Sequence, residues 1–166
     1  MTEPTPRAPG AFASALATAK RTAMFAGRAT RSEVITYALA TLLVSVPASF
    51  LTGLVLPYER HLLVQNVLTL LLAIPVPAVL VRRFHDSGRS GSWVWLAVAV
   101  FAIWAARTIV SATGGVDARL QLDRATGLID WLVILANLVS VILVLLPGTP
   151  GPNRFGDDPR GGAREA

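Results

Sequence analysis

The sequence contains no cysteine and carries little charge. Without cysteine, the chain has no disulfide, no thiolate nucleophile and no cysteine metal site. Charged residues make up 15% of the 166 residues, against roughly 25% in soluble domains, while 53% are hydrophobic and the mean hydropathy is +0.56. A helix in water needs a polar face, and the long uncharged runs of this chain provide none. The composition therefore argues against a soluble domain and indicates an integral membrane protein.

The familiar catalytic motifs are also missing. The chain has no Walker loop, no HExxH, no GxSxG and no dinucleotide fingerprint. The two histidines, His61 and His85, fall on opposite sides of the membrane in the topology predicted below, so they do not form a shared metal site. His85 and Asp86 are neighbours, and adjacent side chains on a helix point about 100° apart, which makes them a poor catalytic dyad. We therefore expect neither an enzyme nor a bound cofactor.

Four apolar runs are long enough to cross a bilayer. They cover residues 34–56, 62–81, 92–112 and 128–146. A helix of about 20 residues spans roughly 30 Å of hydrocarbon, and none of the runs alternates polar and apolar residues as a barrel strand does. The connections between the runs are short, which favours antiparallel neighbours. The predicted fold class is an all-α membrane protein with four transmembrane helices in an antiparallel up-down bundle.

A signal peptide is the alternative reading of the first run. Val46-Pro47-Ala48 resembles a cleavage site that follows an apolar region. However, the segment before the run is much longer than a signal peptide allows, and the apolar run continues past the site. We therefore predict a membrane span with a kink at Pro47.

The ends of the chain differ from its centre. Residues 1–10 hold three prolines and a glycine and are predicted to be disordered, as is the tail 160–166. Residues 11–24 show helical spacing of Phe12, Leu16, Ala19 and Ala23, which fits either a short helix on the membrane surface or a weakly helical, alanine-rich arm. The folded membrane domain is expected to cover residues 11–159.

Basic residues are concentrated on one side of the predicted bundle. Eleven of the 15 lie in the N-terminal arm, the connection between the second and third spans, or the tail. By the positive-inside rule, both termini and this connection lie in the cytoplasm of a bacterial inner membrane. The net charge of +5 then serves topology and contact with anionic lipid, not nucleic acid. The eleven residues are Arg7, Lys20, Arg21, Arg28, Arg31, Arg82, Arg83, Arg89, Arg154, Arg160 and Arg164.

Three polar segments border the spans on that same side, at residues 25–33, 82–93 and 146–159. Their arginines offer paired donors suited to phosphate, their glycines allow tight turns, and Ser90 or Ser92 suits the start of the third span. These features fit an anion site. They fit better a structural cap in which arginines fix the topology, glycines make turns and Asp86 pairs with an arginine. The candidate residues are Arg28, Arg31, Glu33, Arg82, Arg83, His85, Asp86, Gly88, Arg89, Ser90, Gly91, Asn153, Arg154 and Asp158.

The order of these segments resembles a known family. Gly-Arg-x-x-Arg-x-Glu, Arg-Arg-x-His-Asp-x-Gly-x-Ser-Gly-x-Trp and Pro-Gly-Thr-x-Gly-x-Asn-Arg-Phe-Gly-x-Asp-Pro follow one another at span boundaries, as in the bacterial inner-membrane family called domain of unknown function 805. The resemblance covers roughly residues 20–159. It implies a small inner-membrane protein without an established activity. Members usually carry aromatic residues directly after the first motif, where this chain has Val34-Ile35-Thr36.

Two ionisable residues lie within or beside the spans. Arg107 is inside the third run and Asp130 is near the start of the fourth, so antiparallel neighbours would bring them together. An ion pair near the outer surface is one interpretation, and a transport path that also includes Asn137 is the other.

The function expected from these features is that of a non-enzymatic membrane module. Its polar cap would bind an anionic ligand, a lipid headgroup or another membrane protein, with the lipid bilayer as its constant partner. The alternatives are a small transporter or channel component and a membrane enzyme that uses the polar cluster.

The predicted topology can be tested with reporter fusions. Alkaline phosphatase fused after the last residue is expected to be inactive, because it would remain in the cytoplasm, whereas the same reporter fused after Glu59 is expected to be active. Green fluorescent protein at the same two positions serves as the opposite control. An active C-terminal phosphatase fusion would contradict the orientation.

Overall fold

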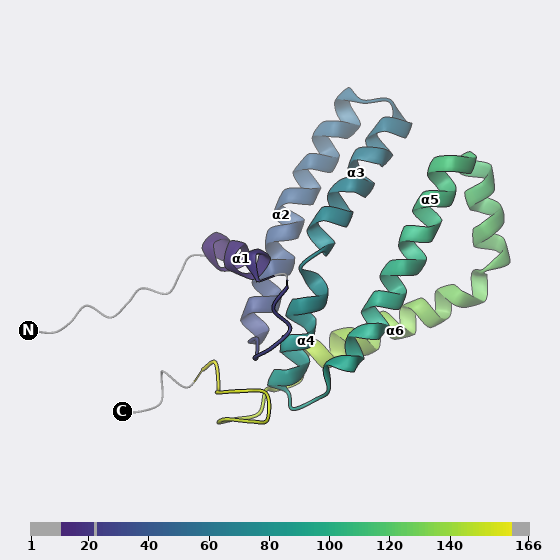
Figure 1. Cartoon of the computed structure of the whole chain (residues 1–166). Helices are drawn as coiled ribbons and strands as arrows, with labels where there is room; N and C mark the ends of the chain where they lie inside the picture. Colours follow the sequence, from purple (N-terminus) through teal and green to yellow (C-terminus); the bar gives the residue numbers. More distant parts are fainter. Residues whose placement is uncertain (1–10, 22, 161–166) are drawn as a thin grey trace, which may run out of the picture.

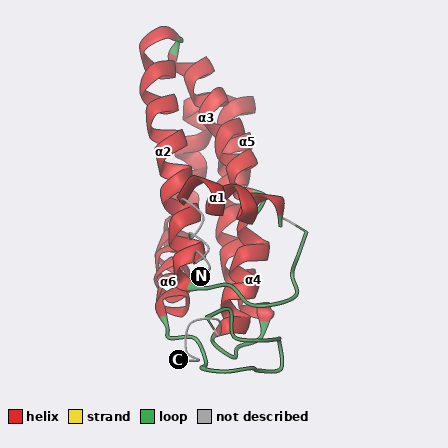
Figure 2. Cartoon of the chain, turned by 90° about the vertical axis from the view of Figure 1, so that its left-hand side faces the viewer, coloured by secondary structure: helices red, strands yellow, loops and turns green. Residues whose placement is uncertain are grey.

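In the computed structural model, residues 11–21 and 23–160 are described, and they contain helices but no strand (Figures 1 and 2). Four stretches are long and apolar enough to cross a membrane: Arg31–Val55, Tyr58–Asp86, Gly91–Gly115 and Gly127–Leu145. The disorder predicted for residues 1–10 and 161–166 lies outside the described residues. In chain order the elements are α1 (Ala11–Lys20), α2 (Arg31–Val55), α3 (Tyr58–Ala73), α4 (Val76–Asp86), the 3₁₀ turn η1 (Gly91–Trp93), α5 (Val94–Ala125) and α6 (Gly127–Leu145).

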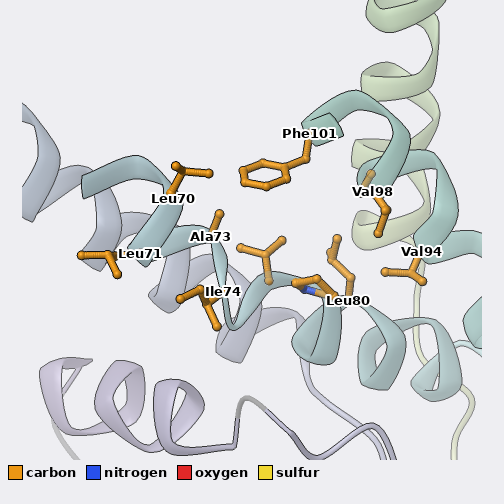
Figure 3. A pocket seen from close by; sticks show the side chains of 11 residues that line it. Leu70, Leu71, Ala73, Ile74, Leu80, Val94, Val98 and Phe101 are labelled. Carbon is orange, nitrogen blue, oxygen red and sulfur yellow. The ribbon is translucent and has the colours of Figure 1, made fainter. Parts of the chain in front are cut away.

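The helices form two antiparallel hairpins that meet at α4. Figure 1 shows α2 beside α3 and α5 followed by the returning α6, with α4 at the base between them. Leu80, Val81 and Phe84 of α4 form the buried apolar cluster together with Val94 and Leu143. The predicted up-down order is present, but the helices do not close into a tight ring. A cavity of about 350 Å³ separates α3 and α4 from α5 (Figure 3).

The second span differs from the prediction at both ends. It was expected at residues 62–81, after a tight loop and before a polar connection. The helix instead begins at Tyr58, breaks at Ile74 and Pro75, and continues as α4 to Asp86. Pro75 and Pro77 explain the break, since neither supplies a backbone N–H and each ring crowds the preceding turn. As a result, Arg82 to Asp86 lie in the last turns of a helix, not in a loop.

The third candidate span, Gly91–Gly115, lies close to the predicted residues 92–112, but helical structure continues after it. Helical structure begins with η1 at Gly91 and runs to Ala125, with one reversal at Gly115. Gly115 has φ 72° and ψ −171°, a backbone conformation that side-chain-bearing residues rarely adopt. The chain turns back there, so the connection to α6 is largely helical (Figure 1).

Helix α1 packs across the N-terminal part of α2 (Figure 2). Among its described side chains, Ala15 and Thr18 are buried, whereas Leu16 of the predicted apolar stripe is 48% exposed. The Thr18 hydroxyl donates to Glu33 Oε1 at 3.2 Å. Glu33 in turn lies in the first turn of α2, where its backbone N–H donates to the N-cap Thr30 hydroxyl at 3.1 Å. This short helix is therefore attached to the start of the first span.

A tyrosine of α2 is hydrogen-bonded to the last turn of α3, just before the break in the second span. The Tyr37 hydroxyl donates to Leu72 O at 2.7 Å, in the last turn of α3, where carbonyls lack helical partners. Replacing Tyr37 with Phe is expected to lower the free energy of unfolding by about 1 kcal/mol, because it removes one hydrogen bond and little else. Thermal unfolding in a mild detergent would measure the change. Tyr58→Phe is the matched control, since Tyr58 is 67% exposed. Equal stability of the two variants would contradict the role of Tyr37.

Candidate functional site: the polar cap

The three polar segments meet at one end of the molecule. We call this assembly, residues 27–33, 82–93 and 146–160, the polar cap; its loops gather below the helix ends in Figure 2. Ala29 N donates to Arg82 O at 3.0 Å, which joins the first segment to the second. Thr149 joins the third, because its backbone N–H and its hydroxyl both donate to Asp86 O, at 2.8 and 3.0 Å.

Asp86 is the centre of the cap. Its side chain is fully buried, and its two oxygens are shared between two arginines that are themselves buried. Oδ1 accepts from Arg28 Nε at 3.0 Å and from Arg28 Nη2 at 2.9 Å, while Oδ2 accepts from Arg83 Nη1. Arg160 Nη2 approaches Oδ1 from the outside at 3.3 Å. A buried carboxylate needs this degree of pairing to remain charged.

Arg28 and Arg83 also donate hydrogen bonds to backbone carbonyls. Arg28 donates to Thr149 O at 2.5 Å and to Gly151 O at 2.6 Å. Arg83 donates from Nε to Val144 O at 2.8 Å and from Nη2 to Leu146 O. The last carbonyls of α6 have no helical partners of their own. Arg28 and Arg83 therefore connect the end of the fourth span, and the segment after it, to Asp86.

Two glycines shape the cap. Gly88 has φ 74° and follows the end of α4; its N–H donates to His85 O, and the next N–H, of Arg89, donates to Phe84 O. This pair of bonds is a Schellman motif, which favours glycine at that position. Gly148 is needed for space, since a Cβ there would lie 2.0 Å from Asp86 Oδ2.

An aromatic stack holds the third segment against α4. The rings of His85 and Phe155 lie 3.9 Å apart and nearly parallel, and the Arg154 guanidinium lies 4.6 Å from the Phe155 ring centre. Asn153 Nδ2 donates to His85 O at 3.0 Å, while His85 Nδ1 lies 3.2 Å from Gly27 O. His85 therefore contacts Phe155 and Gly27, and it is Asp86 that takes the buried arginines. The side chains of His85 and Asp86 therefore contact different groups and do not form a dyad.

Asp158 closes the turn that follows. Its carboxylate accepts from Gly151 N at 3.0 Å and from Arg160 Nε at 2.8 Å. The hydrogen bonds from Arg160 lower the pKa of Asp158 from its ordinary value near 3.8 to about 2. Because the folded pKa is the lower one, this pairing stabilises the turn above pH 4 and is lost as the pH falls toward 2. Arg160, predicted to be disordered, is thus an ordered member of the cap.

Arg82 and Glu33 form a separate pair beside the Asp86 cluster. Arg82 is 2% exposed, and its Nη1 lies 3.0 Å from Glu33 Oε1. Its Nε and Nη2 have no hydrogen-bond partner among the described residues. Ser90, at the start of η1, accepts a hydrogen bond from Ser92 N at 3.3 Å, and Gly91 is the first residue of that turn.

Three candidate arginines stay at the edge of the cap. Arg31, Arg89 and Arg154 each have a hydrogen bond of 3.4 Å to a backbone carbonyl, of Leu145, Ser87 and Gly88 respectively. Within residues 11–21 and 23–160, none of the three has an ion pair with a carboxylate. We call them the rim arginines.

The candidate intramembrane residues lie together in the other hairpin. Arg107 Nη1 lies 2.5 Å from Asp130 Oδ1, its Nε lies 3.4 Å from Asp123 and its Nη2 donates to Thr126 Oγ1 at 2.9 Å. Asn137 Nδ2 donates to Val133 O of its own helix at 3.0 Å. The described residues contain no group of three metal-ligating side chains.

Several residues of the cap were not singled out from the sequence. Thr149 and Gly148 contact Asp86, Phe155 stacks on His85, and Arg160 pairs with Asp158. All but Arg160 fall inside the third motif, so the motif itself was the available signal. Their roles depend on close approach and on carbonyl acceptors, which residue type does not reveal.

The Asp86 cluster is expected to be essential for stability. Asp86→Asn should lower the free energy of unfolding by about 3 kcal/mol or more, because it leaves two buried guanidinium groups without a counter-charge. Asp157→Asn, on the exposed side of the same cap, is the control and should change little. Thermal unfolding of both variants in detergent would decide. A stable Asp86→Asn variant would show that the cluster does not hold the cap together.

Comparison with known proteins agrees with this architecture. The family model described as "Protein of unknown function (DUF805)" matches residues 22–157. The Escherichia coli (strain K12) protein named "Inner membrane protein YhaI" is 30% identical over 142 residues, covering 84% of this chain and 88% of that protein, and the protein of the same name from E. coli O157:H7 gives the same values. No solved structure matches. With four apolar spans and inner-membrane relatives, the chain is an inner-membrane protein, and it belongs to the DUF805 family.

Proposed function

We propose that this protein is a non-enzymatic membrane module whose polar cap faces the cytoplasm and binds anionic lipid headgroups through the rim arginines. The observation that carries the proposal is that the arginines of the cap have two different environments. Arg28 and Arg83 are buried, and they donate hydrogen bonds to Asp86 and to backbone carbonyls. The rim arginines lie at the edge of the cap and have no carboxylate partner among the described residues.

The charge balance of the cap favours an anionic partner. Without the rim arginines the cap is neutral, because its four other arginines are balanced by Glu33, Asp86, Asp157 and Asp158. The rim arginines therefore give the cap its net positive charge. A basic side chain near an anionic membrane surface contributes about 1 kcal/mol of attraction. Three such side chains around one rigid cap supply a selective contact with headgroups.

The polar groups near the other end of the spans support a structural role better than a transport path. The Arg107 guanidinium is engaged by Asp123, Thr126 and Asp130, and Asn137 bonds to its own helix. The two cavities beside the α3–α4 segment are lined mainly by apolar side chains. A path for ions or polar solutes needs polar groups along its length.

The proposal is tested by removing the rim charges together. A variant with Arg31, Arg89 and Arg154 changed to Gln is reconstituted in vesicles that contain spin-labelled phosphatidylglycerol or phosphatidylcholine. Electron paramagnetic resonance then reports which lipid contacts the protein. We expect the preference for phosphatidylglycerol to fall several-fold, because each lost charge removes up to about 1 kcal/mol of attraction.

The matched control removes exposed charges from the opposite end, with Arg60 and Arg124 changed to Gln. This variant should keep most of the preference. If the rim variant keeps its lipid preference, the headgroup role is wrong, and a protein partner for the cap becomes the better explanation. An equal loss in both variants would mean that net charge, not the cap, sets the preference.

A further inference from the structure

Arg82 is buried, and two of its three guanidinium nitrogens have no partner among the described residues. Glu33 accepts from Nη1, but Nε and Nη2 have no partner within the described residues. These two nitrogens form the side of the guanidinium that binds two oxygens of a carboxylate or a phosphate at once. A buried charged group left unpaired in this way is costly. The unpaired side of Arg82 therefore indicates an anionic ligand that the described residues do not provide.

The surroundings of Arg82 suit a phosphate at the membrane surface. Arg82 is one turn from the end of α4, at the border of the span. Helix α1 lies over its partner Glu33, because Thr18 donates to the same carboxylate oxygen that pairs with Arg82. Lys20 and Arg21, at the end of α1, are exposed beside this contact. Positive charge thus outweighs the single carboxylate of Glu33.

An apolar cavity lies along the same two helices as this pair, although neither Arg82 nor Glu33 is among the residues that line it. It has a volume of about 290 Å³ and lies between α2 and the α3–α4 segment. Val34, Tyr37 and Val79 line it. Tyr37 is four residues after Glu33 and Val79 is three residues before Arg82, so they continue the helix faces that carry the ion pair. From there the cavity extends along α2 past Thr41 to Ser45.

The cavity of about 350 Å³ between α3, α4 and α5 provides a comparison. It lies on the other side of the α3–α4 break, and Leu70, Val98 and Phe101 are among its lining residues (Figure 3). All of its lining residues are apolar, and the helix faces that line it carry no unpaired buried donor. Of these two cavities, the one beside α2 lies along the helix faces that carry Arg82, whose Nε and Nη2 are buried without a partner among the described residues.

We propose that this cavity and Arg82 together bind one anionic phospholipid. An acyl chain lies between α2 and the α3–α4 segment, the phosphate takes Nε and Nη2 of Arg82, and α1 closes over the headgroup. The inference shares with the proposed function the preference for anionic lipid, but it depends on a different arginine. The apolar slot is what favours a lipid over a free phosphate ion.

The experiment counts the lipid that the purified full chain retains. The protein is incubated in mild detergent with equal amounts of phosphatidylglycerol and phosphatidylcholine of identical chains, and native mass spectrometry measures the bound species. Glycerol phosphate, which has a headgroup but no chain, is the third probe. The wild-type protein is expected to retain one phosphatidylglycerol. Arg82→Gln should weaken this binding roughly tenfold to a hundredfold, the range for losing hydrogen bonds to a charged group.

A second variant keeps the test decisive if Arg82→Gln does not fold. Thr41→Phe fills the cavity without touching the ion pair and should also remove the lipid. Leu42→Phe, the neighbouring position that is 56% exposed, is its control and should retain the lipid. Arg82→Lys keeps the charge but loses the paired donors, and it should bind more weakly than the wild type.

The outcomes separate this inference from the proposed function. Retention of the phosphatidylglycerol by a folded Arg82→Gln or by Thr41→Phe overturns the inference, as does equal binding of phosphatidylcholine. Loss with Arg82→Gln but not with Thr41→Phe, together with binding of glycerol phosphate, identifies a phosphate site without a chain slot. The variant lacking the three rim arginines should keep the bound lipid even where its general lipid preference has fallen. If only the rim variant loses the lipid, the proposed function stands and this inference fails.

Discussion

The carboxylate of Asp86, buried between Arg28 and Arg83, is the interaction on which the rest of the cap depends. Its partners come from distant parts of the chain, since Arg28 lies 58 residues away and the carbonyls bound by Arg83 lie more than 60 residues away. Transferring these charges out of water is costly, and the cost is offset only when every partner is present. The cluster therefore has one satisfied arrangement, and that arrangement fixes where the first, second and fourth spans end.

This constraint explains the position of α4. The break at Ile74 and Pro75 lets the second span change course, so that its last eleven residues enter the centre of the molecule while α3 stays with α2. One face of α4 supplies Leu80 and Phe84 to the apolar cluster, and its last turn supplies Arg83 and Asp86 to the ionic one. Both hairpins rest on this short helix. Its break also leaves the apolar cavity beside α2.

Much of this architecture could be predicted from the sequence. Hydropathy identified four spans, and the order of the motifs indicated the family, because both signals are carried by residue type along the chain. The charged run from Arg82 to Asp86 was misleading, since polar residues after an apolar run normally leave the membrane as a loop. Here they stay helical, with Arg83 paired to Asp86 and to carbonyls at the end of α6, and Arg82 paired to Glu33. The reversal at Gly115 was missed for a similar reason, as one glycine in a helical pattern signals little without its neighbours.

The segment after α6 gives the cap an order of assembly. Thr149, Gly151 and Arg160 complete the contacts of Asp86 and Arg28, and they are synthesised after every membrane span. Until they leave the ribosome, Arg28 and Asp86 lack part of the lining that buries them. The cap therefore closes only after all four spans have been made. A product truncated before Thr149 would lack the carbonyls and the hydroxyl that enclose Arg28 and Asp86.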